Sequence, residues 1–258
     1  MKRILLPTPV IAATLWFLGC GTPTQTAVNS SNQVNYNKGT SYTFKQNQLD
    51  TAGGTYGQDK PIPSSTDTVT STVVATNQTV YGKSNVTVLV NTHSSGASAD
   101  TTYISQDDNG NYWHYNYGLE AVNNNQAVLR VIQPIQAGWV LQSKLNANAG
   151  DTWTADSTVL NIMGANNTPL LSNALVKITA VEQADTSIVV QGSSVTAKHA
   201  IHTVSINTGL GAPITSTVDT YVSANAGVVV NVVHSAHITS LLFTGYFKGS
   251  ESVLLKHS

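Results

Sequence analysis

Histidines are the residues of this chain that most readily suggest chemistry, because a neutral imidazole binds metal ions and exchanges protons near neutral pH. Two pairs share one spacing: His199 with His202, and His234 with His237. Side chains three residues apart on a β-strand point to opposite faces, because the strand period is two. No carboxylate lies beside either pair in the sequence to complete a catalytic zinc site. We therefore predict no metal site and no cofactor, and we place these histidines on strand faces.

Carboxylates and possible nucleophiles form no recognisable catalytic motif. Asp107 begins an Asp-Asp-Asn-Gly-Asn run, but a calcium loop in this register needs a glutamate where the chain has Gly118. Asp151 and Asp156 would face opposite sides of a strand, unlike the paired carboxylates of a glycosidase. The chain also lacks a Gly-x-Ser-x-Gly elbow, a P-loop and a dinucleotide fingerprint. These observations predict that the protein is not an enzyme.

Aromatic side chains are the remaining candidates for a binding site, and they gather in the first half of the strand-rich region. Buried aromatics usually belong to a packed core, since each ring brings a large apolar area. The same rings can instead line an apolar cavity or form a platform for sugar rings. The candidate ligand-binding residues are Trp113, Tyr115, Tyr117, Trp139 and Trp153.

The segments that carry these residues have the composition of β-strands. From about residue 66 onward Thr and Val dominate, and both are β-branched residues that favour strands. Asn109-Gly110 predicts a hairpin turn between residues 101–106 and 111–117. Repeated hairpins without a long helical period indicate an antiparallel sheet. We predict an all-β domain over residues 66–258, a curved antiparallel sheet or unclosed half-barrel of roughly ten strands.

The first twenty residues are typical of a secretion signal. A short basic start precedes a mostly apolar stretch, residues 4–18, that is too short for an ordinary membrane span. The single cysteine, Cys20, follows directly, and residues 17–20 resemble the lipobox at which bacterial lipoproteins are cleaved and acylated. An ordinary cleaved signal or an anchor helix is the alternative. We predict a signal peptide over residues 1–19 and acyl chains such as palmitate on Cys20.

Composition limits the possible partners. Residues 20–65 are rich in Asn, Gln, Ser, Thr and Gly, which predicts a mostly flexible polar tether between the membrane and the β domain, in which residues 42–44 could form a short strand at the domain edge. Only 10% of all residues are charged and the formal net charge is −1, which excludes a strongly basic nucleic-acid binder. A single cysteine excludes a disulfide scaffold. The expected location is the bacterial cell envelope, at the outer membrane or the extracytoplasmic face of the cell membrane.

Two stretches are similar to segments of bacterial lipoproteins of unassigned function. Residues 145–153 end in Gly-Asp-Thr-Trp, and residues 216–230 end in Ala-Asn-Ala-Gly-Val-Val-Val. The β domain of those lipoproteins looks like the open half-barrel of the lipoprotein carriers LolA and LolB. Asn225 departs from the family pattern, which has Pro or Gly there. The resemblance implies an unclosed β-barrel that holds a hydrophobic ligand, and it carries over no catalytic residue.

Two functions are consistent with these features. The first is a membrane-anchored, non-catalytic lipoprotein that binds an apolar or amphipathic ligand, such as an acyl chain, in an open β-barrel. The alternative is a structural or interaction protein of the cell envelope that has no small-molecule ligand and recruits a protein partner, for example through an exposed strand edge.

Overall fold

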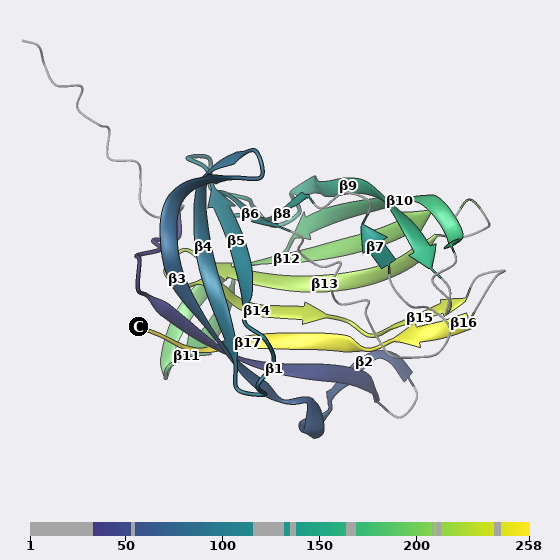
Figure 1. Cartoon of the computed structure of the whole chain (residues 1–258), viewed down its shortest axis with the longest axis horizontal. Coiled ribbons are helices and arrows are strands. Elements are labelled where there is room, and N and C mark those ends of the chain that lie inside the picture. The colour runs from purple at the N-terminus through teal and green to yellow at the C-terminus, as the bar shows by residue number, and fades with distance from the viewer. Residues whose placement is uncertain are drawn as a thin grey trace, which may run out of the picture. The chain divides into compact units, whose positions relative to one another are not determined.

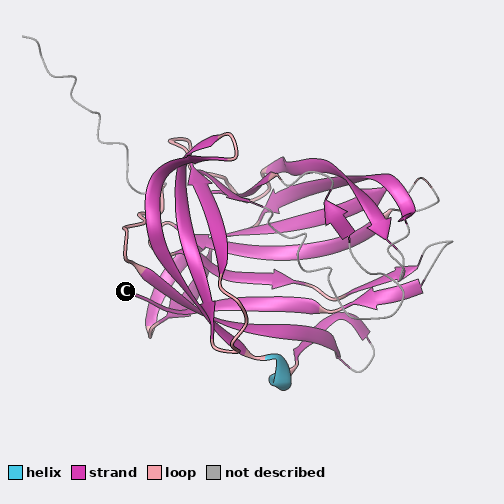
Figure 2. Cartoon of the chain, viewed as in Figure 1, coloured by secondary structure: helices cyan, strands magenta, loops and turns pink. Residues whose placement is uncertain are grey.

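An antiparallel β-sheet contains most of the chain from residue 33 onward in this computed structural model. The structure describes residues 33–52, 55–115, 132–134, 138–163, 169–207, 209, 213–239 and 244–258. Within these residues fifteen strands form one sheet, a further pair forms a separate ribbon, and Pro63–Ser65 is a short 3-10 helix (Figure 2). No helix in the described part of the chain is long and apolar enough to cross a membrane.

The strands follow the chain in hairpins. The first group is β1 (Ser41–Ala52), β2 (Thr55–Pro61), β3 (Asp67–Val80), β4 (Lys83–His93), β5 (Asp100–Gln106), β6 (Asn111–Tyr115), β7 (Ile132–Pro134) and β8 (Trp139–Lys144). The second group is β9 (Thr152–Met163), β10 (Pro169–Glu182), β11 (Thr186–Val190), β12 (Ser193–Asn207), β13 (Ile214–Ser223), β14 (Gly227–Val233) and β17 (Gly249–His257). The separate ribbon is β15 (Ala236–Thr239) with β16 (Thr244–Phe247).

The first and last strands of the described chain, β1 and β17, are neighbours near the centre of the sheet. The sheet order runs β7-β9-β10-β12-β13-β14-β17-β1-β3-β4-β5-β6-β8, with β2 beside β1 and β11 beside β12. Figure 1 shows β1 running beside β17, and their register extends from Tyr42 opposite His257 to Leu49 opposite Gly249. On its other side β1 pairs with β3, where Gln46 lies opposite Asp67.

This position of β1 corrects the predicted tether. The segment assigned to a tether over residues 20–65 contains β1 and β2, and the β domain begins well before residue 66. Val34 and Tyr42 are almost fully buried. The prediction failed because β1 alternates Tyr42 and Phe44 with polar residues, and a polar strand gains its stability from ladder pairing that composition does not reveal. Residues 1–32, including the predicted signal peptide and Cys20, lie outside the described residues.

The sheet curls so that its edge strand β8 packs across its other half. The Trp153 indole N–H donates to the Leu141 carbonyl at 3.0 Å, and His202 Nε2 donates to the Gln142 carbonyl at 2.8 Å. Both bonds link β8 to the strands opposite it by side chains, because β8 pairs only with β6 among the described strands. The predicted curved, unclosed antiparallel sheet is therefore confirmed, with more strands than the expected ten.

Two apolar clusters form the hydrophobic core of this curved sheet. One is formed by β8, β9, β10, β12 and β13 around Ile178 and Trp153, and the other by β1, β3–β6 and the 222–229 region around Tyr42 and Tyr112. The predicted hairpin turn is also present between β5 and β6, where Asp107 accepts backbone hydrogen bonds from Asn109 and Asn111 at 3.0 Å each.

We predict that Tyr42→Ala lowers the free energy of unfolding by about 3 kcal/mol, because it removes a buried ring that packs on Tyr36 with centroids 5.6 Å apart. Lys45→Ala, an exposed position on the same strand, should change it by less than about 0.5 kcal/mol. Urea unfolding followed by circular dichroism measures both. Equal stability of the Tyr42→Ala and Lys45→Ala proteins would contradict the placement of β1 in the folded sheet.

Candidate functional site

A cavity of about 580 Å³ lies against the inner face of the sheet. Its wall comes from β1, β3, β4, β5, β6, β8, β14 and β17, so strands from both ends of the described chain contribute. Interiors of folded proteins seldom contain voids larger than a water molecule. This volume falls within the roughly 300–1,000 Å³ that small-molecule pockets usually have.

The wall changes from polar to apolar along the strands. On β4 the inward residues are successively His93, Asn91 and Leu89. On β5 the same order holds for Asp100, Thr102 and Ile104, which lie beside them in the ladder. Every second residue of a strand faces the same side, so the inward residues of each of these two strands change from polar to apolar along its length. The cavity therefore has a polar end next to an apolar, aromatic region that includes Phe44 and Tyr112.

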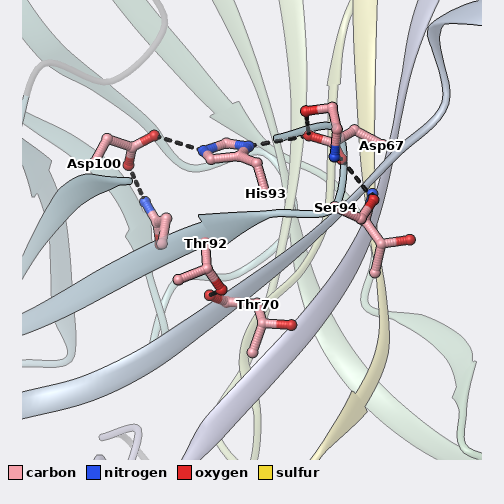
Figure 3. Close-up of polar contacts among 9 residues, drawn as sticks. Asp67, Thr70, Thr92, His93, Ser94 and Asp100 are labelled. Carbon is pink, nitrogen blue, oxygen red and sulfur yellow. Dashed lines mark hydrogen bonds and ion pairs between the residues drawn. The ribbon is translucent and has the colours of Figure 1, made fainter. Parts of the chain in front are cut away.

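A histidine held between two carboxylates forms the polar end (Figure 3). His93 Nδ1 lies 3.0 Å from Asp67 Oδ2, and His93 Nε2 lies 2.9 Å from Asp100 Oδ2. Asp67 also accepts hydrogen bonds from Ser94 and Ser95, and Asp100 accepts one from Asn91. Ionised carboxylates only accept hydrogen bonds, so both ring nitrogens of His93 must donate, which requires the protonated imidazolium.

The pKa values of this group agree with a charged triad. Hydrogen bonds to Asp100 and Asp67 raise the pKa of His93 above its ordinary value. Burial alone would raise the pKa of Asp67, but hydrogen bonds from Ser94, His93 and Ser95 outweigh burial and hold that pKa well below its usual range. The three side chains together carry one net negative charge when His93 is protonated.

The described residues among those predicted for ligand binding lie outside the lining of this cavity: Trp113, Tyr115, Trp139 and Trp153. Trp113 and Tyr115 alternate along β6 with Tyr112 and His114, and the latter two form part of the cavity wall. Tyr115 stacks on Tyr81 at 4.2 Å, and the Lys83 ammonium lies 3.5 Å from the centre of the Trp113 ring. Trp139 packs edge-on against Tyr115 and donates its N–H to the Tyr81 carbonyl. The structure therefore groups three of the predicted rings on the face of the sheet opposite the cavity.

The other two predicted rings have separate places. Trp153 is buried in the apolar cluster of β8–β13, where its N–H bond to Leu141 holds β8 in position. Tyr117 lies outside the described residues. No group of three or more His, Cys, Asp or Glu side chains in the described ranges is arranged to hold a metal ion.

A second histidine–aspartate network lies on the other side of the sheet. Asp219 receives a hydrogen bond from His199 Nε2 at 2.5 Å and another from His234 Nε2. His234 Nδ1 donates to Asp59 at 2.6 Å. His202 points the opposite way and is only 1% exposed, which confirms that the His199–His202 spacing places the two rings on opposite faces. The carboxylates absent from the local sequence are thus supplied by β2 and β13.

Sequence reasoning missed the residues that line the cavity. His93 with Asp67, and His93 with Asp100, are separated by 26 and 7 residues, and they meet only through the pairing of β3, β4 and β5. One local signal was available: polar residues occupy every second position at the end of β4, His93 and Asn91, in register with apolar Leu89. The missing information was which face of the strand points inward.

Comparison with known proteins supports the fold. No family model and no curated protein matches the chain. It is similar to the crystal structure of a "putative exported protein with YmcC-like fold" from Bacteroides fragilis, with a TM-score of 0.51, 14% identity and coverage of 88% of this chain and 98% of that one. A "putative lipoprotein" from Parabacteroides distasonis matches with a TM-score of 0.49, 14% identity and coverage of 87% and 97%. The likeness to the Bacteroides fragilis structure concerns the fold, and it agrees with the expected open β-barrel domain.

We predict that His234 titrates near pH 9. Its hydrogen bonds to Asp219 and Asp59 raise its pKa to about 9, compared with about 6.5 when unfolded. Because the folded pKa is the higher one, His234 contributes stability that is complete below about pH 6.5 and is lost as pH rises through about 9. Histidine ring signals in NMR give the pKa, and unfolding of wild type and His234→Gln across this range gives the stability difference.

Two aspartate variants provide the control for that titration. Asp219→Asn should move the His234 pKa down toward its ordinary value, because it removes the largest cause of the shift. Asp185→Asn removes a carboxylate that pairs with Lys198 instead and should leave His234 unchanged. A His234 pKa near 6.5 in the wild type would contradict the network.

Proposed function

We propose that this protein is a lipid-anchored, non-catalytic protein of the bacterial cell envelope that binds an amphipathic ligand inside its curved sheet. The observation that carries the proposal is the cavity of about 580 Å³, whose wall has a polar end and an apolar region. A ligand with one polar group and one hydrocarbon part, such as an acyl chain with its head group, would complement both.

The apolar part of the wall supplies the affinity in this proposal. Burying hydrocarbon contributes roughly 0.8 kcal/mol for each methylene group. Phe44, Leu89 and Ile104 offer such a surface, and they come from three strands whose positions the sheet fixes. The wall is therefore formed in advance, which lowers the ordering cost of binding.

The polar groups support binding more than catalysis. Both ring nitrogens of His93 are already bonded to carboxylates, so neither is available to take a proton from a substrate. His234 likewise has both ring nitrogens engaged, by Asp59 and Asp219, and His199 Nε2 is bonded to Asp219. Among the described residues these networks hold charges in fixed positions, and a fixed charge suits recognition of a ligand head group.

The predicted anchor would place the cavity at a membrane. Cys20 precedes the first described residue, Gln33, by 13 positions, so an acylated Cys20 would tether the β domain close to the bilayer. The description of one fold neighbour as an exported protein is in keeping with an envelope location at the outer membrane or the extracytoplasmic face of the cell membrane.

The test is binding of a neutral amphipath, n-octanol, to the full chain in phosphatidylcholine nanodiscs, measured by titration calorimetry with empty nanodiscs as the blank. We expect saturable binding with a Kd below about 1 mM. Ser71→Phe fills the inner face of β3 and should weaken binding at least tenfold. Thr70→Phe places the same ring on the opposite face of the same strand and should leave binding unchanged.

A second cavity-filling variant keeps the test valid if Ser71→Phe does not fold. Ser252→Phe fills the wall from β17, and circular dichroism shows whether each variant retains its sheet. Absence of saturable octanol binding in the wild type, or equal binding in folded Ser71→Phe and Ser252→Phe proteins, would overturn the proposal.

A further inference from the structure

We propose that the ligand of this cavity carries a cationic hydrogen-bond donor, an aliphatic ammonium group, at the end that meets Asp67, His93 and Asp100. This inference rests on the proposed function and narrows its ligand class. A fatty acid has an anionic head group and is therefore excluded as the ligand, which is instead an amphipath of the opposite charge.

The first observation is the charge of the wall. Three acidic residues line the cavity, Asp67, Asp100 and Glu251, and the described lining contains no Lys or Arg. His93 is the one cationic group at the polar end of the described lining, and its charge is shared between two carboxylates. Asp100 has a side chain that is 57% exposed, so it stands at the open rim. An entering cation is attracted by this charge, whereas an entering carboxylate or phosphate is repelled.

The second observation is independent of charge. Asn91 and Gln142 both line the cavity and both are more than nine-tenths buried, with exposed fractions of 8% and 1%. In each case the side-chain carbonyl oxygen, Asn91 Oδ1 and Gln142 Oε1, has no hydrogen-bond partner. Buried polar atoms are nearly always paired, and Asn91 lies opposite Asp100, so its unpaired oxygen indicates a missing donor at the polar end, whereas Gln142 lies farther along the wall, on β8 beside Tyr112 and His114 of β6.

The orientation of Asn91 follows from its neighbours. Its Nδ2 group donates to the Asp100 carboxylate and to Thr102 Oγ1, at 2.9 Å in the latter case. A carboxylate accepts hydrogen bonds and cannot donate one when ionised, so the amide nitrogen must face Asp100 and the oxygen is left over. The free group at this position is therefore an acceptor.

Charge and hydrogen bonding select the same chemical group. An ammonium has three N–H donors and no acceptor, so it can satisfy carbonyl and carboxylate oxygens together. A hydroxyl offers one donor and no charge, and a carboxylate offers no donor and carries a negative charge. The gradient of the wall then places the hydrocarbon part beside Leu89 and Ile104, one or two steps along the strands from the acidic rim.

Three ligands with the same eight-carbon chain test the proposal: octylammonium, n-octanol and octanoate, titrated at pH 7 into the full chain in phosphatidylcholine nanodiscs. We expect octylammonium to bind at least tenfold more tightly than octanoate, with octanol between them. Asp100→Asn should weaken octylammonium binding three- to tenfold and weaken octanol binding by a smaller factor. Asp100→Lys should reverse the order of the two charged ligands.

Asp108→Asn is the matched control, because Asp108 is an exposed carboxylate in the turn between β5 and β6 and lies outside the cavity lining. It should leave all three affinities unchanged. Each ligand is also titrated into empty nanodiscs, and this blank is subtracted for every variant. Partition of a ligand into lipid therefore cancels when its affinities for the variants are compared.

The outcomes separate this inference from the function on which it rests. Saturable binding of all three ligands with equal affinity, or tighter binding of octanoate, would overturn the cationic head group and leave the amphipath-binding cavity intact. Absence of binding by all three would overturn both. Loss of octylammonium binding in Asp108→Asn as large as in Asp100→Asn would assign the effect to overall charge and would also overturn the inference.

The same ammonium chemistry occurs on free aliphatic amines and on lipids with an ethanolamine head group. Lysophosphatidylethanolamine, compared with lysophosphatidylglycerol of the same chain length, distinguishes the sources. Preference for the ethanolamine lipid that is lost in Asp100→Lys supports a lipid as the source, and binding of octylammonium without either lysolipid supports a free amine.

Discussion

Pairing between β1 and β17 joins the two halves of the sheet. Without this ladder, β1–β6 and β8 would form one sheet and β7, β9–β14 and β17 another. The residues that pair, such as Tyr42 with His257, are separated by most of the chain. Closing so long a loop costs conformational entropy that the ladder must offset, and contacts of this kind form slowly in β-proteins. The cavity exists only when this pairing has formed, because its wall comes from both halves.

The alternation of an antiparallel strand then decides which side chains face the cavity. On β6, Tyr112 and His114 face inward, whereas Trp113 and Tyr115 face outward and pack among tyrosines and Lys83. The same rule sends His202 to the interior and His199 to the opposite surface. A shift of one residue in any of these ladders would exchange the two faces, so the register determines the chemistry of the cavity.

Charged residues are few, and the structure uses several of them in networks in place of a dispersed polar surface. Asp67, His93 and Asp100 form one network, and Asp59, His234, Asp219 and His199 form the other. The first network joins the neighbouring strands β3, β4 and β5, and in it His93 lies between two carboxylates. In the second, His234 lies between Asp59 of β2 and Asp219 of β13, and Asp219 also accepts a hydrogen bond from His199 of β12. In the first network the charge is at the rim of the cavity.

The sequence alone determined the all-β class, the antiparallel sheet, the hairpin at Asn109-Gly110 and the opposite facing of His199 and His202. These follow from local causes: β-branched composition, turn chemistry and a strand period of two. It did not determine that residues 41–52 lie at the centre of the sheet, because polar strands are stabilised by partners far along the chain. Nor did it separate Tyr112 from Trp113, or bring Asp67, His93 and Asp100 together. Only the tertiary structure decided those points, since the inward face of a strand and the meeting of distant residues depend on the long-range register between strands and on the curl of the sheet, neither of which is a property of any short segment.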